Sequence, residues 1–231
     1  RDIEPQLTLR LYKGQDERLY RKGLELIGTG ATYPLLYNDE VNVPAVQNAL
    51  GVSRMDAEQY VPFGCGEYII DHKSFGSPNG VINMLKALEV TLFNGRELIK
   101  GQQMGLAEGG LTAFDTFEEL YAAYKRQIAL SIEVLAEVEK LILVETAKDT
   151  PFLMMSLLYD GCIEQGRGML EGGLEWLGAT LESYGNINAV DSLQAIREMV
   201  YEKKLISRER LLEALAHDFE GFETERDLLV S

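Results

Sequence analysis

Cys65 and Glu67 are the residues of this 231-residue chain whose types and spacing most directly suggest catalysis. They stand in Gly64-Cys65-Gly66-Glu67, directly after the strand-like run 59–63. On an extended backbone, residues two apart project from the same face, about 7 Å apart. The pair is therefore a candidate nucleophile or radical site beside a candidate base.

A second stretch, Gly161-Cys162-Ile163-Glu164, repeats the Gly-Cys-x-Glu pattern, so the tetrapeptide alone does not identify a catalytic cysteine. Cys162 lies in the apolar stretch 154–163, where a buried structural thiol is the usual role. Cys65 lies between glycines, where a backbone can approach a ligand closely. We expect Cys162 to be structural. For Cys65, the alternative to catalysis is a buried free thiol at the end of a strand.

Three kinds of chemistry could use Cys65. The first is nucleophilic catalysis by its thiolate, with His72 as the base, although a short spacing does not establish such a pair. The second is metal binding, which the two cysteines and two histidines disfavour because they form no metal-binding spacing. The third is hydrogen-atom abstraction by a sulfur radical, and only this one requires Glu67 on the same face as a proton acceptor.

Composition narrows the class of protein. Apolar residues make up 46% and charged residues 26% of the chain, which is typical of a globular protein. Lys and Arg total 22 against 37 Asp and Glu, a formal charge of -15, which disfavours nucleic acid and anionic membranes as partners. The sequence shows neither a signal-peptide pattern nor an apolar run near the roughly 20 residues that span a bilayer. We expect a cytoplasmic protein without a structural metal or a disulfide framework.

The elements before Cys65 alternate between strand and helix patterns. Period-2 and helical spacings predict strands over 5–11, 34–37 and 59–63 and helices over 16–27 and 44–50, with Ser53 as the N-cap of a further turn. This alternation indicates parallel α/β structure, in which sites lie at the carboxyl ends of strands. Cys65 is expected at such an end.

The rest of the chain is expected to be mainly helical. Helices are predicted over 79–93, 116–147, 191–202 and 207–217, with a glycine-rich connector over 101–110 and a glycine-punctuated, mainly helical region up to 185. The helix over 116–147 would be roughly 45 Å long at 1.5 Å per residue. We divide the chain into a strand/helix segment, 1–100, and a mainly helical segment, 101–231, of the same larger domain.

The chain resembles the pyruvate formate-lyase-like glycyl radical enzymes in blocks that follow that family's order. Val61-Pro62-Phe63-Gly64-Cys65-Gly66-Glu67 and the stretch 83–95 resemble its active-site cysteine loop and the following helix. Further similar blocks are Pro5-Gln6-Leu7-Thr8-Leu9-Arg10, Pro34-Leu35-Leu36-Tyr37-Asn38-Asp39-Glu40, residues 160–166, Gly172-Gly173 and residues 191–196. The similarity covers essentially the whole chain.

The resemblance implies a ten-stranded α/β barrel with Cys65 on a finger loop inside it. Cys65 would be the thiyl radical site and Glu67 the general base of a lyase or dehydratase acting on a small polyol, amine or hydroxy acid. In the family, a separate S-adenosylmethionine-dependent iron–sulfur activating enzyme places a radical on a glycine in an Arg-Val-x-Gly-Tyr-like motif. The family is often dimeric, so a homodimer is among the expected assemblies.

Three departures qualify this comparison. Gly66 stands where studied dehydratases usually have Val or Ile. Tyr68 stands where many of them have Pro. An Arg-Val-x-Gly-Tyr-like motif does not occur in the 231 residues. We therefore expect a central segment of such an enzyme that binds no cofactor itself, with the radical glycine and other parts of the barrel outside this chain. The alternatives are a short non-radical interaction or split-enzyme module, or a cysteine hydrolase using Cys65 and His72.

Overall fold

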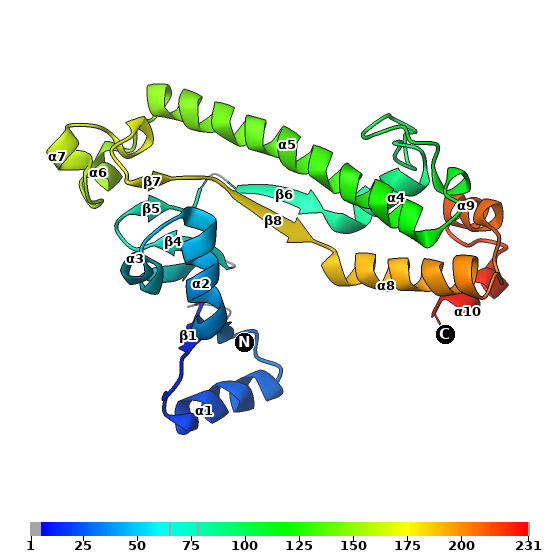
Figure 1. The fold of residues 1–231 in the computed structure, drawn as a ribbon, viewed down its shortest axis with the longest axis horizontal. Coiled ribbons are helices and arrows are strands. Elements are labelled where there is room, and N and C mark those ends of the chain that lie inside the picture. Colours follow the sequence, from blue (N-terminus) through cyan, green and yellow to red (C-terminus); the bar gives the residue numbers. More distant parts are fainter. Residues whose placement is uncertain (1–5, 65, 78, 231) are drawn as a thin grey trace. The chain divides into compact units, whose positions relative to one another are not determined.

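A computed structural model describes residues 6–64, 66–77 and 79–230 (Figure 1). The chain forms two compact units that interleave along the sequence. The first unit holds residues 1–78 and 142–180, and the second holds residues 79–141 and 181–231. That the segments 1–100 and 101–231 belong to one larger domain stays a prediction.

The first unit opens with the predicted strand, helix and strand. They are β1 (Thr8–Leu11), α1 (Glu17–Gly28) and β2 (Leu35–Asn38), and the two strands pair in parallel from Thr8↔Leu35 to Leu11↔Asn38. Gly23 lets α1 approach β1 closely, since a Cβ at Gly23 would lie 3.1 Å from Leu9 Cδ2.

Two helices follow β2, namely α2 (Asp39–Leu50) and α3 (Arg54–Glu58). The sequence pattern placed the start of the first near Pro44, but α2 begins five residues earlier because the Asn38 side chain accepts the Glu40 N–H. Gly51 ends α2, and Ser53 caps α3 by accepting the Asp56 N–H, as predicted.

The third strand departs from the expected parallel arrangement. β3 (Tyr60–Phe63) pairs antiparallel with β4 (Glu67–Ile70), from Tyr60↔Ile70 to Phe63↔Glu67. The two strands form a hairpin connected through residues 64–66, and Gly64 and Gly66 have φ of 56° and 136°. Neither Gly64 nor Gly66 is therefore in an extended backbone conformation. The predicted position of Cys65 at the carboxyl end of a parallel strand lies outside the described residues.

A small apolar core holds α2, α3 and the hairpin together. Its buried members are Val43, Val46, Val52, Ala57, Tyr60 and Ile70, with Trp176 packed against them. Trp176 belongs to the short strand β7 (Trp176–Leu177), which pairs in parallel with β5 (Ser74–Phe75). The unit also contains α6 (Leu153–Ser156) and α7 (Cys162–Gln165). The region up to 185 is thus less helical than predicted.

The second unit combines a two-stranded sheet with helices. β6 (Asn79–Asn83) pairs with β8 (Thr180–Tyr184), and the helices are α4 (Met84–Leu92), α5 (Phe117–Asp149), α8 (Asn186–Ile196), α9 (Arg208–Ala216) and α10 (Glu223–Val230). The part of α5 from residue 142 on belongs to the first unit. α8 continues into a π-helical turn, Arg197–Glu202. Buried leucines on four of these helices form the main core, Leu88, Leu92, Leu120, Leu193 and Leu211.

Three boundaries in this unit differ from the sequence patterns. Residues 79–83 are a strand, because Asn83 caps α4 by accepting the Lys86 N–H and so starts the helix at Met84. α8 begins at Asn186, five residues before the start predicted at residue 191. The helix predicted over 116–147 is confirmed as α5, which extends slightly further, to Asp149. Among the described residues, no helix is both long enough and apolar enough to cross a bilayer.

Candidate active site

Glu67 is buried at the turn of the β3–β4 hairpin. It is the first residue of β4, it pairs with Phe63, and 8% of it is exposed. Its Oε2 accepts the backbone N–H of Gly66 at 2.8 Å, and the same N–H also reaches the Phe63 carbonyl at 3.1 Å. The carboxylate of Glu67 is therefore folded back over the turn and held there by a backbone donor. Cys65, the other predicted catalytic residue, lies outside the described residues.

The two glycines of the turn are required by space as well as by backbone conformation. A Cβ at Gly64 would lie 2.9 Å from each carboxylate oxygen of Glu67. A Cβ at Gly66 would lie 2.8 Å from the Tyr37 hydroxyl. From the sequence, we expected a ligand to approach the backbone at these glycines. In the structure, the Glu67 carboxylate and the Tyr37 hydroxyl occupy part of the space beside them.

Tyr37, which sequence reasoning did not select, reaches the hairpin from β2. Its ring meets the ring of Tyr68 edge-on at 6.1 Å between centroids, and Tyr68 in turn contacts Tyr60 at 5.4 Å. In the sequence, Tyr37 looked like an ordinary strand residue. Its link to the turn depends on strand pairing and hairpin geometry, which the sequence pattern does not encode.

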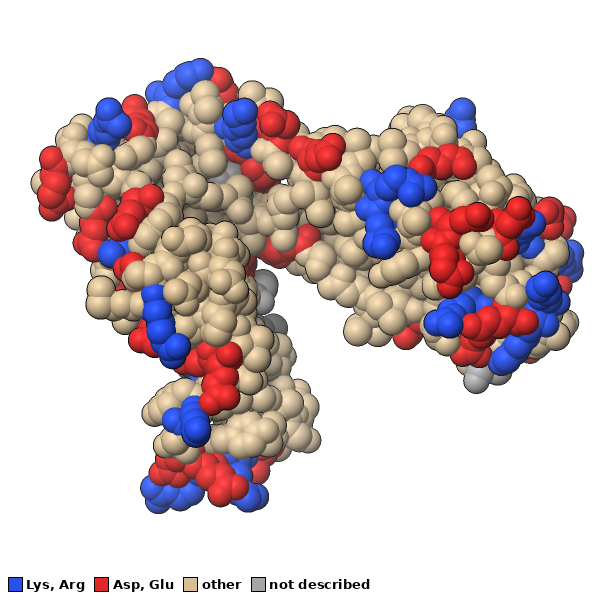
Figure 2. All heavy atoms as spheres, viewed as in Figure 1, with Lys and Arg blue, Asp and Glu red and all other residues tan. Residues whose placement is uncertain are grey.

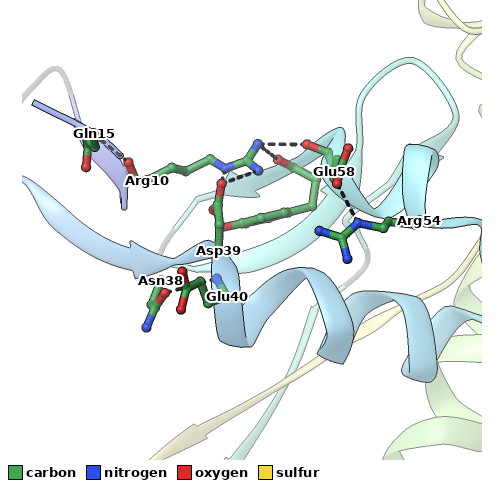
Figure 3. A network of polar contacts seen from close by, with 8 residues as sticks. Arg10, Gln15, Asn38, Asp39, Glu40, Arg54 and Glu58 are labelled. Carbon is green, nitrogen blue, oxygen red and sulfur yellow. Dashed lines mark hydrogen bonds and ion pairs between the residues drawn. The ribbon is translucent and has the colours of Figure 1, made fainter. Parts of the chain in front are cut away.

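A polar network fixes the other end of the hairpin (Figure 3). Arg10, on β1, donates from Nε and Nη2 to the two carboxylate oxygens of Asp39, each at 2.8 Å. Its Nη1 donates to the backbone carbonyls of Glu58 and Tyr60 at 3.1 and 3.0 Å. The Arg10 guanidinium also lies 4.0 Å from the centre of the Tyr60 ring. One side chain thus ties β1 and the start of α2 to the strand that leads to the turn.

The charges of this network shift the pKa values of its acids. Burial opposes ionisation of Asp39, but hydrogen bonds from Arg10 and Tyr60 outweigh it, and the pKa of this carboxyl lies below its usual range. Burial and the hydrogen bond of 2.6 Å to Asp39 raise the pKa of Tyr60 to about 12. At neutral pH, an ionised Asp39 therefore accepts hydrogen bonds from a cationic Arg10 and a neutral Tyr60.

His72, the base of the hydrolase alternative, lies beyond Ile70, at the end of the hairpin opposite residues 64–66. It has a positive φ of 59°, and its side chain is largely exposed. Its Nδ1 donates to the Leu158 carbonyl at 3.2 Å, and this bond together with nearby Asp71 raises the pKa of the imidazole. Because Cys65 lies outside the described residues, its pairing with His72 in a cysteine hydrolase stays a prediction.

Cys162 is a buried free thiol, as expected. It packs with Met169, Leu170 and Leu174, and burial raises the pKa of its thiol. The neighbouring Glu164 has a structural use, since its Oε2 accepts the Gly161 N–H at 3.1 Å at the start of α7. The second Gly-Cys-x-Glu stretch is therefore the start of a helix.

The described residues contain no group of three or more His, Cys, Asp or Glu side chains arranged to hold a metal ion. On the face drawn in Figure 2, Lys and Arg side chains lie among Asp and Glu side chains. Among the described residues, several Lys and Arg side chains form ion pairs, for example Arg54 with Glu58 at 2.8 Å and Arg210 with Glu225 at 2.8 Å.

The chain is similar in sequence to known dehydratases and lyases. Trans-4-hydroxy-L-proline dehydratase of Clostridioides difficile is 31% identical over 227 residues, which are 98% of this chain and 29% of that protein. The isethionate sulfite-lyase of Oleidesulfovibrio alaskensis is 32% identical over 238 residues, covering 98% of this chain and 28% of that enzyme. The chain thus spans less than a third of the length of these relatives.

Solved structures agree with the sequence comparison. The glycerol-bound B12-independent glycerol dehydratase of Clostridium butyricum superposes with a TM-score of 0.87 at 27% identity, over 97% of this chain and 28% of that one. Hydroxyproline dehydratase of C. difficile, solved with trans-4-hydroxy-L-proline bound, gives a TM-score of 0.87 at 31% identity, over 96% of this chain and 28% of that one. The prediction of a mixed α/β segment of a glycyl radical enzyme barrel is confirmed.

The family model described as "Pyruvate formate lyase-like" matches residues 1–231. Its match agrees with the order of blocks that the sequence shows and with the structural neighbours, one of which is a glycyl radical enzyme from Archaeoglobus fulgidus at a TM-score of 0.86. The chain therefore belongs to the pyruvate formate lyase-like family of glycyl radical enzymes.

Proposed function

We propose that this chain supplies the thiyl cysteine, Cys65, and the general base, Glu67, of a glycyl radical dehydratase or lyase. The observation that carries the proposal is the carboxylate of Glu67, which is buried at the hairpin turn two residues after Cys65 in the sequence and is held by the Gly66 N–H at 2.8 Å. A carboxylate held at one position can accept a proton from a substrate placed over the turn. The similarity to named dehydratases and lyases along 98% of the chain supports the same reaction class.

In the proposed reaction, the Cys65 thiyl takes a hydrogen atom from a substrate carbon, which gives a thiol and a carbon radical. Glu67 accepts the proton of the neighbouring hydroxyl or amine as the bond to the leaving group breaks. The leaving group departs with the bonding electron pair, and Glu67 then gives its proton to the leaving group or to solvent. The product radical then takes the hydrogen atom back from the Cys65 thiol, which restores the thiyl. The starting radical comes from a glycine outside this chain, installed by a radical S-adenosylmethionine activating enzyme.

The substrate is a small molecule with a leaving group next to the carbon that loses the hydrogen atom. Relatives named for trans-4-hydroxy-L-proline, glycerol and isethionate make these three compounds the first probes to use. They cover loss of a ring hydroxyl, of a chain hydroxyl and of sulfite.

The test uses the complete protein that contains this chain, activated anaerobically by its activating enzyme. Glu67→Gln is expected to form the glycyl radical normally by electron paramagnetic resonance, yet to lose at least about 100-fold in turnover, because a general base contributes about that much. Cys65→Ala is expected to keep the glycyl radical and lose all turnover.

Glu164→Gln is the matched control, since Glu164 follows Cys162 in the same pattern but caps α7. It is expected to turn over like the wild type. Full activity in Glu67→Gln would remove Glu67 from the mechanism. Failure of the wild type to form a glycyl radical with its activating enzyme would overturn the proposed function.

A further inference from the structure

Tyr37 touches both chain neighbours of Glu67. Its hydroxyl oxygen lies 2.8 Å from the point that a Cβ on Gly66 would occupy, whereas its Cζ lies 3.9 Å from that point, so the side chain approaches Gly66 with the hydroxyl first. Its ring packs edge-on against Tyr68, with an interplanar angle of 84°. Glu67 therefore stands between two residues that Tyr37 contacts.

We propose that Tyr37 is a positioning residue that holds the hairpin turn, and through it the Glu67 carboxylate, in the geometry used for proton transfer. This role rests on the proposed function of Glu67. Tyr37 itself is not required to touch the substrate, since it acts through Gly66 and Tyr68.

The backbone of the turn is held by the Gly66 N–H, which reaches the Phe63 carbonyl at 3.1 Å, but Gly66 offers no side chain for further support. Gly66 has φ of 136°, a conformation open to glycine, and its missing side chain can make no packing contact. Yet the Gly66 N–H is the donor that holds Glu67 Oε2 at 2.8 Å. A group packed over Gly66 limits the motion of that donor, and the Tyr37 hydroxyl occupies this position.

The same short segment of chain also fixes the far end of the hairpin. Two residues after Tyr37, Asp39 accepts a hydrogen bond of 2.6 Å from the Tyr60 hydroxyl, and Tyr60 is the first residue of β3. The Asp39 carboxylate also accepts hydrogen bonds from Nε and Nη2 of Arg10. Tyr37 on β2 thus contacts the turn of the hairpin, and Asp39 at the start of α2 contacts its base. Two contacts fix the direction of the hairpin as well as its position.

The variant Tyr37→Phe tests the contribution of the hydroxyl alone, because it removes the hydroxyl and keeps the aromatic ring. The variant keeps the edge contact with Tyr68 and leaves a gap over Gly66. Small displacements of a catalytic group lower the rate of the chemical step strongly, by up to about 100-fold for 1 Å. We expect kcat to fall about tenfold or more with KM nearly unchanged, because substrate binding does not depend on the proton acceptor's exact position.

The experiment uses the complete protein activated anaerobically, with Tyr12→Phe as the matched control, since Tyr12 is 57% exposed. Glycyl radical content is measured first and is expected to equal that of the wild type. Turnover is then measured with trans-4-hydroxy-L-proline, glycerol and isethionate. Hydrogen exchange of peptides covering 63–69 in the unactivated protein provides a readout that needs no substrate, and exchange there is expected to be faster in Tyr37→Phe only.

The outcomes separate the two proposals. Lower kcat with normal radical content and faster exchange at 63–69 supports the positioning role. Wild-type kcat in Tyr37→Phe, with Glu67→Gln inactive, overturns the role of Tyr37 and leaves the proposed function intact. If the wild type forms no glycyl radical, the proposed function fails, and the positioning role, which rests on it, fails with it. Unchanged exchange at 63–69 in Tyr37→Phe overturns the positioning role whatever the activity.

Discussion

Arg10 and Asp39 face each other through two parallel hydrogen bonds of 2.8 Å, one to each carboxylate oxygen. The pair is partly buried, with side-chain exposures of 31% and 17%, and it joins β1 to the first residue of α2. Because Arg10 also donates to the backbone carbonyls of Glu58 and Tyr60, the same guanidinium determines where β3 begins. Four predictions concern this network and the surroundings of Cys162.

Arg10→Lys is expected to loosen the base of the hairpin. Lysine cannot form the two parallel bonds to Asp39 while also reaching two carbonyls, so we expect a loss of about 1–2 kcal/mol in the local free energy of opening, discounted for partial exposure. Hydrogen exchange of peptides covering 57–63 measures this loss. Arg54→Lys is the control, because its pair with Glu58 is exposed at 74% and 47% and is worth less than about 0.5 kcal/mol. Equal effects of the two substitutions would contradict the prediction.

Asp39 is expected to make stability depend on acid pH. Its pKa in the folded protein lies below its usual value, so the ionised form contributes stability above about pH 4, and this contribution is lost as the pH falls through the folded pKa. The wild type should therefore unfold at a higher temperature than Asp39→Asn at neutral pH, with a difference that shrinks below about pH 4. Thermal midpoints recorded across this range provide the measurement, and a difference independent of pH would exclude the proposed origin.

Gly173→Ala is expected to disrupt the packing around Cys162. A Cβ at Gly173 would lie 2.8 Å from Cys162 Sγ and 2.5 Å from the Arg167 carbonyl oxygen, and a backbone carbonyl cannot move aside cheaply. We expect a cost of about 1–3 kcal/mol, visible as faster limited proteolysis within 150–180. Gly178→Ala, which meets no atom within 4 Å, is the matched control and should behave as the wild type.

Cys162 is expected to resist alkylation in the native protein. It is 3% exposed and its thiol pKa is raised by burial, so it offers little accessible thiolate at about pH 8. Mass spectrometry after iodoacetamide treatment should show labelling of Cys162 at least about tenfold slower in the native protein than in urea. Equal rates in both conditions would show that this thiol is not buried in solution.

Local signals in the sequence located many elements correctly. The N-cap predicted at Ser53 is confirmed, because Ser53 accepts the backbone N–H of Asp56, three residues later. The helix predicted over 116–147 is confirmed as well. These features depend on neighbours within one or two helical turns, so the chain specifies them without knowledge of the fold.

The pairing of the strands could not be predicted from local sequence signals, unlike the helices and their caps. The run 59–63 was recognised as a strand, but its antiparallel partner, Glu67–Ile70, and the strands 79–83 and 180–184 were not. Short strands carry few residues of periodic signal, and their partners are chosen by contacts across the fold. The expected parallel third strand was therefore wrong, while the finger loop that carries Cys65, inferred from family resemblance, stays a prediction.

For the candidate site, the order Gly64-Cys65-Gly66-Glu67 and the family could be recognised from the sequence, because both are properties of the linear chain. The contact of the Glu67 carboxylate with the Gly66 N–H could not be predicted, and neither could the position of Tyr37, 29 residues before Gly66, over the turn. Both arise because the hairpin and the strand β2 meet through packing between residues far apart in sequence, which no local pattern records.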